Sequence, residues 1–366
     1  MVDESVLDDP ERLARADPDG MLRVLASAGP QVRRTAVSAI EGGVRALADD
    51  GLPRSIVVLG TGVAALAGAA LAAIAGQQAH APIVVHRDAW LPRWVGAADM
   101  VIGLSPTGAG STALAAADQA AARGARVVGV GPSESPLAAV VAGARGPYVV
   151  IEDARWRRAT FWPLLTGLAA LAGAVGAVDV TEEMLDRAAV RLDEEAITSR
   201  PDSESVLNPA KQLALRLIDA APAVWAGTEV AAIAARRFTE SLAGMAATPA
   251  PYSLLDGDPA VFGLFGGGLA EPGDVEDLFR DRVEEPVARR LHPVLLREAE
   301  PCPALDRARD LAEYFQLPIT ELLADEGPAL LRLAQLVGQL DLAAAYLAIA
   351  IGLDPARETA EGPAPA

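Results

Sequence analysis

One segment of the sequence gathers the residue types that bind a phosphate group. Residues 105–112, Ser-Pro-Thr-Gly-Ala-Gly-Ser-Thr, follow a short hydrophobic run and open an alanine-rich stretch. Hydroxyls and glycine amides at the start of a helix donate hydrogen bonds to a phosphate monoester without needing a net positive charge. A simple helix cap needs one hydroxyl, so four hydroxyls in eight residues favour phosphate binding. The candidate ligands are Ser105, Thr107, Gly108, Ser111 and Thr112.

Two further loops occupy comparable positions, each directly after a predicted strand. Gly60 and Gly62 follow the first strand, and with Ala65 their spacing partly fits a dinucleotide-binding loop. No acidic residue ends the second strand, so nucleotide binding is the weaker alternative. Ser133 lies in the third loop, which either closes over the same ligand or caps a helix.

The charged residues and the single cysteine limit the chemistry further. With 31 basic and 49 acidic residues the formal net charge is -18, which repels a phosphate backbone, so we expect no nucleic acid partner. Lys211 is the only lysine, and the other thirty basic residues are arginine. Cys302 has no second cysteine for a disulfide or a zinc site. We expect neither a metal nor another cofactor.

The sequence also predicts a cytoplasmic protein without a membrane span. The first 20 residues are acidic and lack the basic start and apolar core of a signal peptide. Two uncharged stretches, 56–85 and 159–178, are long enough to cross a bilayer. The first is interrupted by glycines and Pro82, and much of it is alanine, which contributes little to insertion.

An alternation of β-branched runs and alanine-rich segments predicts the elements that position these loops. Apolar strands separated by helices indicate a parallel sheet covered on both faces. Residues 1–178 are therefore expected to form a doubly wound α/β sandwich. The predicted strands are 56–60, 82–86, 100–104, 126–130 and 148–151, and the predicted helices are 63–75, 112–123, 136–142 and 155–177.

Residues 179–366 repeat this logic less regularly. They predict a second α/β domain with a helical C-terminal part and a polar tail from Pro355. The expected helices are 181–196, 208–220, 229–247, 319–340 and 341–353, and the expected strands are 222–227, 261–266 and 292–299.

The order of these motifs resembles that of a sugar isomerase (SIS) domain, whose serine and threonine loop holds the phosphate of a sugar phosphate. More narrowly, the chain is similar to the bifunctional phosphoglucose/phosphomannose isomerases, which pair two SIS domains. NPAKQLA from Asn208, PAVWAG, RRFTESLAG, and YLAIAIGLDP from Tyr346 follow one another in the order of that group. The resemblance spans roughly residues 20 to 355. It implies two SIS domains, a hexose 6-phosphate ligand and a homodimer.

The resemblance extends to the phosphate loop, where this chain also departs from the family sequence. The family sequence Ser-x-Ser-Gly-Asn-Thr-x-Glu is matched at Ser105, Thr107 and Gly108. Ala109 and Gly110 stand where the family has Asn and Thr. Ser111 and Thr112, one or two places further on, can supply hydroxyl groups in their stead.

The resemblance also implies catalytic roles. It aligns the family's glutamate base with Glu240. It aligns the family's arginine beside the enediolate with Arg158, or with Arg157 if the alignment shifts by one residue. The residues themselves leave a second interpretation of Glu240, a surface ion pair with Arg236 or its neighbour. Aldose-ketose isomerisation needs such a base and such a positive group, together with an acid that opens the ring.

Two members of the family's catalytic set are missing. The position of the ring-opening histidine falls near Asp256, and no lysine follows Pro355 where the family has one. We therefore expect a protein that binds a hexose 6-phosphate and has weak or no isomerase activity. The alternatives are an active isomerase, a non-catalytic sugar-phosphate sensor, and a regulatory partner of a sugar-metabolising enzyme.

Overall fold

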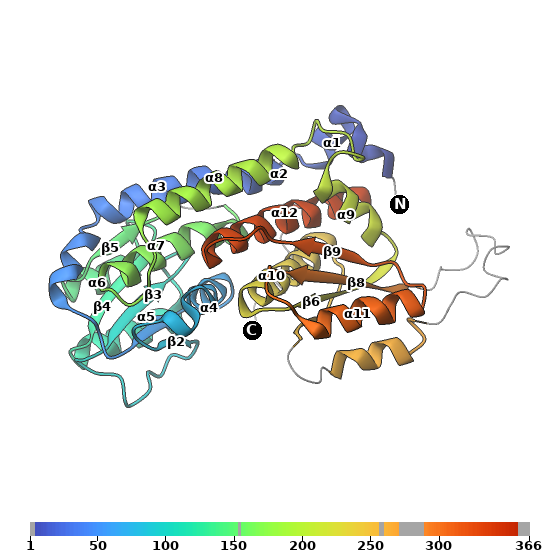
Figure 1. Cartoon of the computed structure of the whole chain (residues 1–366). Coiled ribbons are helices and arrows are strands. Elements are labelled where there is room, and N and C mark those ends of the chain that lie inside the picture. The colour runs from blue at the N-terminus through green and yellow to red at the C-terminus, as the bar shows by residue number, and fades with distance from the viewer. Residues whose placement is uncertain (1–3, 153–154, 256–259, 271–288, 358–366) are drawn as a thin grey trace, which may run out of the picture. The chain divides into compact units, whose positions relative to one another are not determined.

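The structure is a computed structural model that describes residues 4–152, 155–255, 260–270 and 289–357 (Figure 1). The chain folds into two compact units. The first unit holds residues 27–193 and the short segment 329–331. The second unit holds the described residues before Ser27, those from 194 to 328, and those from 332 onward. Each unit contains one parallel β-sheet.

The first sheet has five parallel strands in the order β2-β1-β3-β4-β5, and all five predicted strands are present. Leu59 of β1 lies opposite His86 on one side and Gly103 on the other. Because the direction of winding reverses at β1, the switch point lies between the ends of β1 and β3. The strands are β1 (Ile56–Leu59), β2 (Ile83–His86), β3 (Met100–Leu104), β4 (Arg126–Gly131) and β5 (Tyr148–Val150).

Helices cover both faces of this sheet, which confirms the doubly wound prediction (Figure 1). On one face α4 and α7 pack against the strands, and α3 packs on α7 and on β5. On the other face α5 and α6 pack on the central strands and on each other. The helices are α3 (Ala28–Glu41), α4 (Val63–Ala75), α5 (Ser111–Ala122), α6 (Pro136–Gly143) and α7 (Phe161–Ala174), followed by α8 (Glu182–Thr198). Short 3-10 turns are η2 (Val44–Asp50), η3 (Gly76–Gln78) and η4 (Arg157–Thr160).

The second sheet has four parallel strands in the order β7-β6-β8-β9. Trp225 lies at the centre of the apolar cluster on one face, together with Leu295 and Leu305. The strands are β6 (Ala220–Ala226), β7 (Tyr252–Leu254), β8 (Arg290–Arg297) and β9 (Thr320–Leu323). The helices are η1 (Glu4–Asp8), α1 (Pro10–Ala16), α2 (Met21–Ala26), α9 (Pro209–Leu217), α10 (Glu229–Ala246), η5 (Ala260–Gly266), α11 (Pro303–Tyr314) and α12 (Ala329–Ala350).

Several sequence predictions in the second unit are wrong. The two helices expected over 319–340 and 341–353 do not end and begin at 340/341, because α12 runs unbroken across that point. Residues 261–266 form the helix η5 instead of a strand, because Phe262 and Phe265, three residues apart, both pack on Trp225. The predicted helix over 319–340 starts as the edge strand β9, which pairs with β8. Helical structure begins only at Ala329, because Pro328 serves as its N-cap residue and separates it from the strand.

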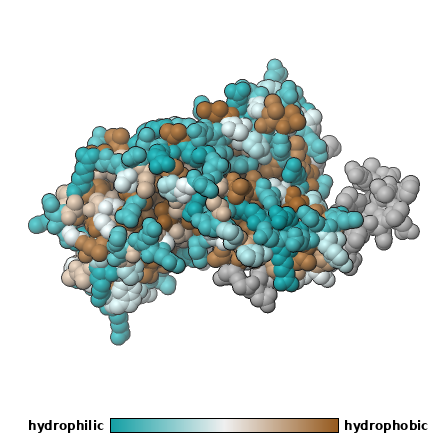
Figure 2. Space-filling model, in the orientation of Figure 1, coloured by the Kyte–Doolittle hydropathy of each residue, from teal (hydrophilic) through white to brown (hydrophobic). Residues whose placement is uncertain are grey.

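Among the described residues, only α12 is long and apolar enough to cross a membrane by length and composition. Of its most apolar 18-residue window, 83% is buried inside the protein. A core helix of a globular fold has this pattern. Figure 2 shows hydrophilic residues spread over the visible face, with apolar residues in small groups among them.

Candidate functional site

The Ser105 loop, residues 105–112, lies at the switch point of the first sheet. Strand β3 ends at Leu104 and helix α5 begins at Ser111. The N-cap residue of α5 is Gly110, so no side chain caps the first N–H groups of the helix. A Cβ atom on Gly110 would lie 3.6 Å from Ser105 Oγ, which places this hydroxyl beside the helix start. These N–H groups and hydroxyls are what an anion requires.

Gly108 fixes the shape of this loop. Its φ is +65°, a left-handed conformation that side chains rarely adopt, and a Cβ atom here would lie 2.1 Å from the Cβ atom of Ser135. The Gly108 carbonyl accepts a hydrogen bond from Leu137 N–H at 3.0 Å. Only glycine therefore allows the Ser105 loop to rest against the loop that follows β4.

The β4 loop is itself held by a tyrosine. Ser135 caps α6 by accepting a hydrogen bond from Ala138 N–H at 3.2 Å. Its hydroxyl lies 3.2 Å from the Tyr148 hydroxyl, which also donates to the Pro132 carbonyl at 3.2 Å. Burial raises the pKa of the Tyr148 phenol. Ser133 is exposed and lines a different cavity, beside α3.

The Gly60 loop ends the neighbouring strand β1 at the same edge of the sheet. A Cβ atom on Gly60 would lie 2.7 Å from that of Ala64, so this glycine lets α4 pack closely. Gly62 has φ +54° and open space around it, which leaves room for a ligand. The His86 carbonyl accepts from Gly60 N–H at 3.2 Å, and His86 Nε2 is shielded from solvent with no hydrogen-bond partner among the described residues.

The arginine candidates lie in η4, directly before α7. Arg158 is partly buried, whereas Arg157 is exposed and its carbonyl accepts a hydrogen bond from Thr160 Oγ1 at 2.6 Å. The partial burial of Arg158 makes it the better candidate for an ordered position. Its assignment as the arginine beside the enediolate stays a prediction.

Glu240 lies on α10 of the second unit, with its side chain 48% exposed. It accepts a hydrogen bond from Arg236 Nε at 2.9 Å, one helical turn away. Arg237 is buried and binds Asp341 of α12 through Nε at 2.9 Å and Nη2 at 2.6 Å. The ion pair that the sequence offered as the alternative for Glu240 is therefore present. Asp256 lies outside the described residues.

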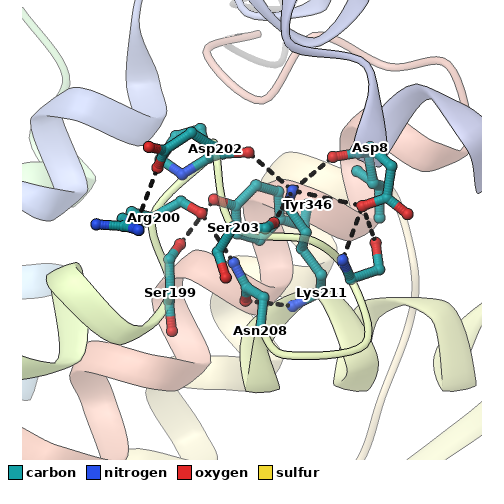
Figure 3. A network of polar contacts seen from close by, with 11 residues as sticks. Asp8, Ser199, Arg200, Asp202, Ser203, Asn208, Lys211 and Tyr346 are labelled. Atoms are coloured by element: carbon teal, nitrogen blue, oxygen red, sulfur yellow. Dashed lines mark hydrogen bonds and ion pairs between the residues drawn. The ribbon is translucent and has the colours of Figure 1, made fainter.

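Lys211 is buried in a polar network of the second unit (Figure 3). Its Nζ donates three hydrogen bonds to main-chain carbonyls, those of Leu7 at 2.5 Å, Pro201 at 2.8 Å and Ser203 at 2.7 Å. The ammonium also lies 5.6 Å from the centre of the Tyr346 ring. Burial lowers the pKa of Lys211. With all three donors in use, the only lysine is a structural residue.

The same network explains two of the quoted motifs. Asn208 caps α9 through Lys211 N–H at 3.0 Å and donates to the Arg200 carbonyl at 3.0 Å. The Tyr346 hydroxyl donates to the Ser199 carbonyl at 2.7 Å. NPAKQLA and YLAIAIGLDP thus both hydrogen-bond to main-chain carbonyls of residues 199–203 (Figure 3).

Comparison with known proteins finds a protein family and solved structures that this chain resembles. Residues 207–360 match the family described as the bacterial phospho-glucose isomerase C-terminal SIS domain. This match supports an SIS-domain, sugar isomerase-like family for that part of the chain. No curated protein matches the chain.

Solved structures share the SIS fold over nearly the whole chain. A candidate phosphosugar isomerase from Silicibacter pomeroyi is 16% identical, with a TM-score of 0.64, over 92% of this chain and 99% of its own. The C-terminal domain of glucosamine-fructose-6-phosphate aminotransferase from Francisella tularensis is 14% identical, with a TM-score of 0.59, over 92% and 98%. A glucose-6-phosphate isomerase like protein from Thermus thermophilus is 20% identical, with a TM-score of 0.50, over 88% and 93%. At these identities the likeness concerns the fold.

A buried carboxylate at the edge of the second SIS sheet was not anticipated. Glu298 directly follows β8, where it accepts a hydrogen bond from the Thr228 hydroxyl and lies 2.9 Å from Arg332 Nε. Burial raises the pKa of this carboxyl. In the sequence, the one feature that could have indicated Glu298 is its position near the carboxyl end of the predicted strand 292–299. Among the described residues no group of three His, Cys, Asp or Glu side chains is placed to hold a metal ion.

His292 should make the stability of this protein depend on pH. It is buried on β8, its Nε2 lies 2.9 Å from Thr320 Oγ1, and burial together with the nearby Arg216 lowers its pKa from 6.5 to about 4. Between these values the unfolded chain binds a proton that the folded chain does not, so stability falls as the pH drops from 6.5 to 4. The expected loss is about 3 kcal/mol.

Urea unfolding at several pH values measures this loss. His292→Gln should flatten the profile in that window, because glutamine binds no proton there. A wild-type profile that does not fall between pH 6.5 and 4 would contradict the assignment.

Proposed function

We propose that this protein binds a hexose 6-phosphate at the Ser105 loop, as SIS sugar isomerases do. The observation that supports it is the combination found at the switch point of the first sheet. An uncapped helix N-terminus, the Ser105 hydroxyl beside it and a left-handed Gly108 stand together there. The match of residues 207–360 to the bacterial phospho-glucose isomerase family points to the same ligand class.

In this proposal the phosphate is bound without a lysine. N–H groups at the start of α5 and the hydroxyls of Ser105, Thr107, Ser111 and Thr112 donate to its oxygens. The partial positive charge at a helix N-terminus favours the dianion, even in a chain with a net charge of -18. The main chain at Gly62, which has open space around it, is the second part of the backbone that can come close to the ligand.

In the isomerase version of this function, Glu240 moves the proton between C1 and C2. Arg158 stabilises the negative charge that develops on the enediolate oxygens. Ring opening is left to water, to Asp256 or to spontaneous anomerisation. The product of glucose 6-phosphate or mannose 6-phosphate would be fructose 6-phosphate.

The second candidate is a sugar-phosphate sensor or a regulatory partner of a sugar-metabolising enzyme. Two observations favour it: Glu240 is already paired with Arg236, and Lys211 is fully occupied by main-chain carbonyls. A cytoplasmic homodimer is proposed for either version, and sedimentation of the purified protein tests the homodimer.

Solvent-deuterium exchange at C2 of glucose 6-phosphate, followed by NMR, separates the two versions. An isomerase exchanges this hydrogen, and Glu240→Gln should slow the exchange by about 100-fold or more, because the variant cannot accept the proton. Ser241→Ala, at the next position of α10, is the control that keeps Glu240. Saturable binding without any exchange would leave the sensor version and exclude the isomerase.

A further inference from the structure

A cavity of about 910 Å³ lies between α3, β5 and the loop that follows β4 in the first unit. The Ser105 loop does not contribute to its lining. One wall is α3, with Arg34, Ser38 and Glu41, and the opposite wall is β5 with Tyr148. Ser133 also lines it. The volume falls in the range of small-molecule sites.

The charges of the lining cancel. The lining holds two arginines, Arg33 and Arg34, and two glutamates, Glu41 and Glu152. Arg34 Nε already lies 3.0 Å from Glu152 Oε1. Arg33 is likewise bound to Asp193 at 2.6 Å. A free anion would meet two carboxylates in the lining, and a cation would meet two guanidinium groups. The lining therefore favours a neutral ligand over an ion.

The uncharged part of the lining combines hydroxyl and amide groups with apolar groups. The polar members are Gln31, Thr35, Ser38 and Ser133, and the apolar members include Val37, Val150, Ile151, Pro132 and Pro163. A sugar presents hydroxyls around its rim and C–H groups on its faces. A neutral polyol thus satisfies both kinds of surface at once.

Contacts lead from this cavity to the Ser105 loop. Tyr148 lines the cavity, and its hydroxyl lies 3.2 Å from the hydroxyl of Ser135. Ser135 is the residue against which Gly108 packs, with no room for a Cβ atom. A ligand that displaces Tyr148 would therefore move Ser135, and with it the Gly108 turn.

We propose that this cavity is a second site, for a neutral sugar or sugar alcohol, and that its occupancy alters phosphate binding at the Ser105 loop through Tyr148 and Ser135. The coupling rests on the proposed function, whereas the cavity site does not. Such a site would let an unphosphorylated sugar regulate the binding of a phosphorylated one.

Calorimetric titration of the full chain with maltose and with sorbitol tests the site. One of them should bind saturably, and Val37→Trp, which fills the cavity from an exposed position on α3, should weaken that binding by about tenfold or more. Ala46→Trp, exposed on η2 and outside this lining, is the matched control. Absence of saturable binding, equal binding to Val37→Trp, or preferential binding of gluconate would overturn the site. A change of oligomeric state in Val37→Trp alone would assign the cavity to an interface instead.

The coupling is tested by titrating glucose 6-phosphate with and without the saturating polyol. The dissociation constant should change by about fivefold, and Tyr148→Phe, which keeps the ring but removes the hydroxyl, should abolish the change. Two ligands that bind independently would overturn the coupling. If glucose 6-phosphate does not bind at all, the proposed function fails, and the maltose and sorbitol titrations still decide on the cavity.

Discussion

Gly108→Ala should lower the affinity for glucose 6-phosphate by about 100-fold or more, which corresponds to roughly 2.7 kcal/mol. The new Cβ atom would lie 2.1 Å from the Cβ atom of Ser135, and φ at this residue is +65°. The Ser105 loop must therefore leave its position against Ser135, and the hydroxyls and amides can no longer converge on one phosphate. Isothermal titration calorimetry measures the loss.

Gly124→Ala is the matched control for this variant. Gly124 also has a left-handed backbone, with φ +74°, but the nearest atom to an added Cβ is 3.9 Å away, on Ala97. The control should cost about 1 kcal/mol of stability, from backbone strain alone, and should leave binding unchanged. Equal affinities for Gly108→Ala and the wild type, with both folded by circular dichroism, would refute the role of the Ser105 loop.

Lys211→Met should lower the free energy of unfolding by about 4 kcal/mol. The buried ammonium satisfies the carbonyls of Leu7, Pro201 and Ser203, and methionine leaves all three without their donor. Because Leu7 belongs to the N-terminal segment, the variant should also expose that segment to proteases. Urea unfolding and limited proteolysis measure the two effects.

Arg200→Met is the comparison for Lys211→Met within the same network. Arg200 lies 3.1 Å from Asp202, but the two side chains are 60% and 69% exposed, so this pair should contribute less than about 1 kcal/mol. If both variants lose the same stability, Lys211 is not the central residue of the network.

The sequence predicts the first sheet well for a physical reason. Its strands are buried on both faces, so they appear as continuous β-branched runs, and the glycine and hydroxyl loops at their ends are easily recognised. The pattern predicts a helix at the edge strand β9 because TELL is short and partly exposed, and a helical pattern follows it. It predicts a strand at 261–266 because an apolar run of six residues has no periodicity that separates a strand from a helix.

The candidate site was predictable only in part. The Ser105 loop is contiguous, so its spacing in the sequence carries over to space. The three carbonyls around Lys211 belong to the main chain of Leu7, Pro201 and Ser203. No pattern of side chains in the sequence indicates that main-chain groups surround this lysine. The link from Gly108 to Tyr148 through Ser135 likewise exists only once strands β3, β4 and β5 are side by side.

The central claim is that the Ser105 loop binds the phosphate of a hexose 6-phosphate. Titrating the ¹⁵N-labelled protein with glucose 6-phosphate and following its amide resonances tests this most directly. The amides of residues 107–113 should shift saturably with glucose 6-phosphate and should not shift with glucose at the same concentration. Ser105→Ala combined with Thr107→Ala should abolish those shifts. Saturable shifts confined to other parts of the chain, or none at all, would contradict the account.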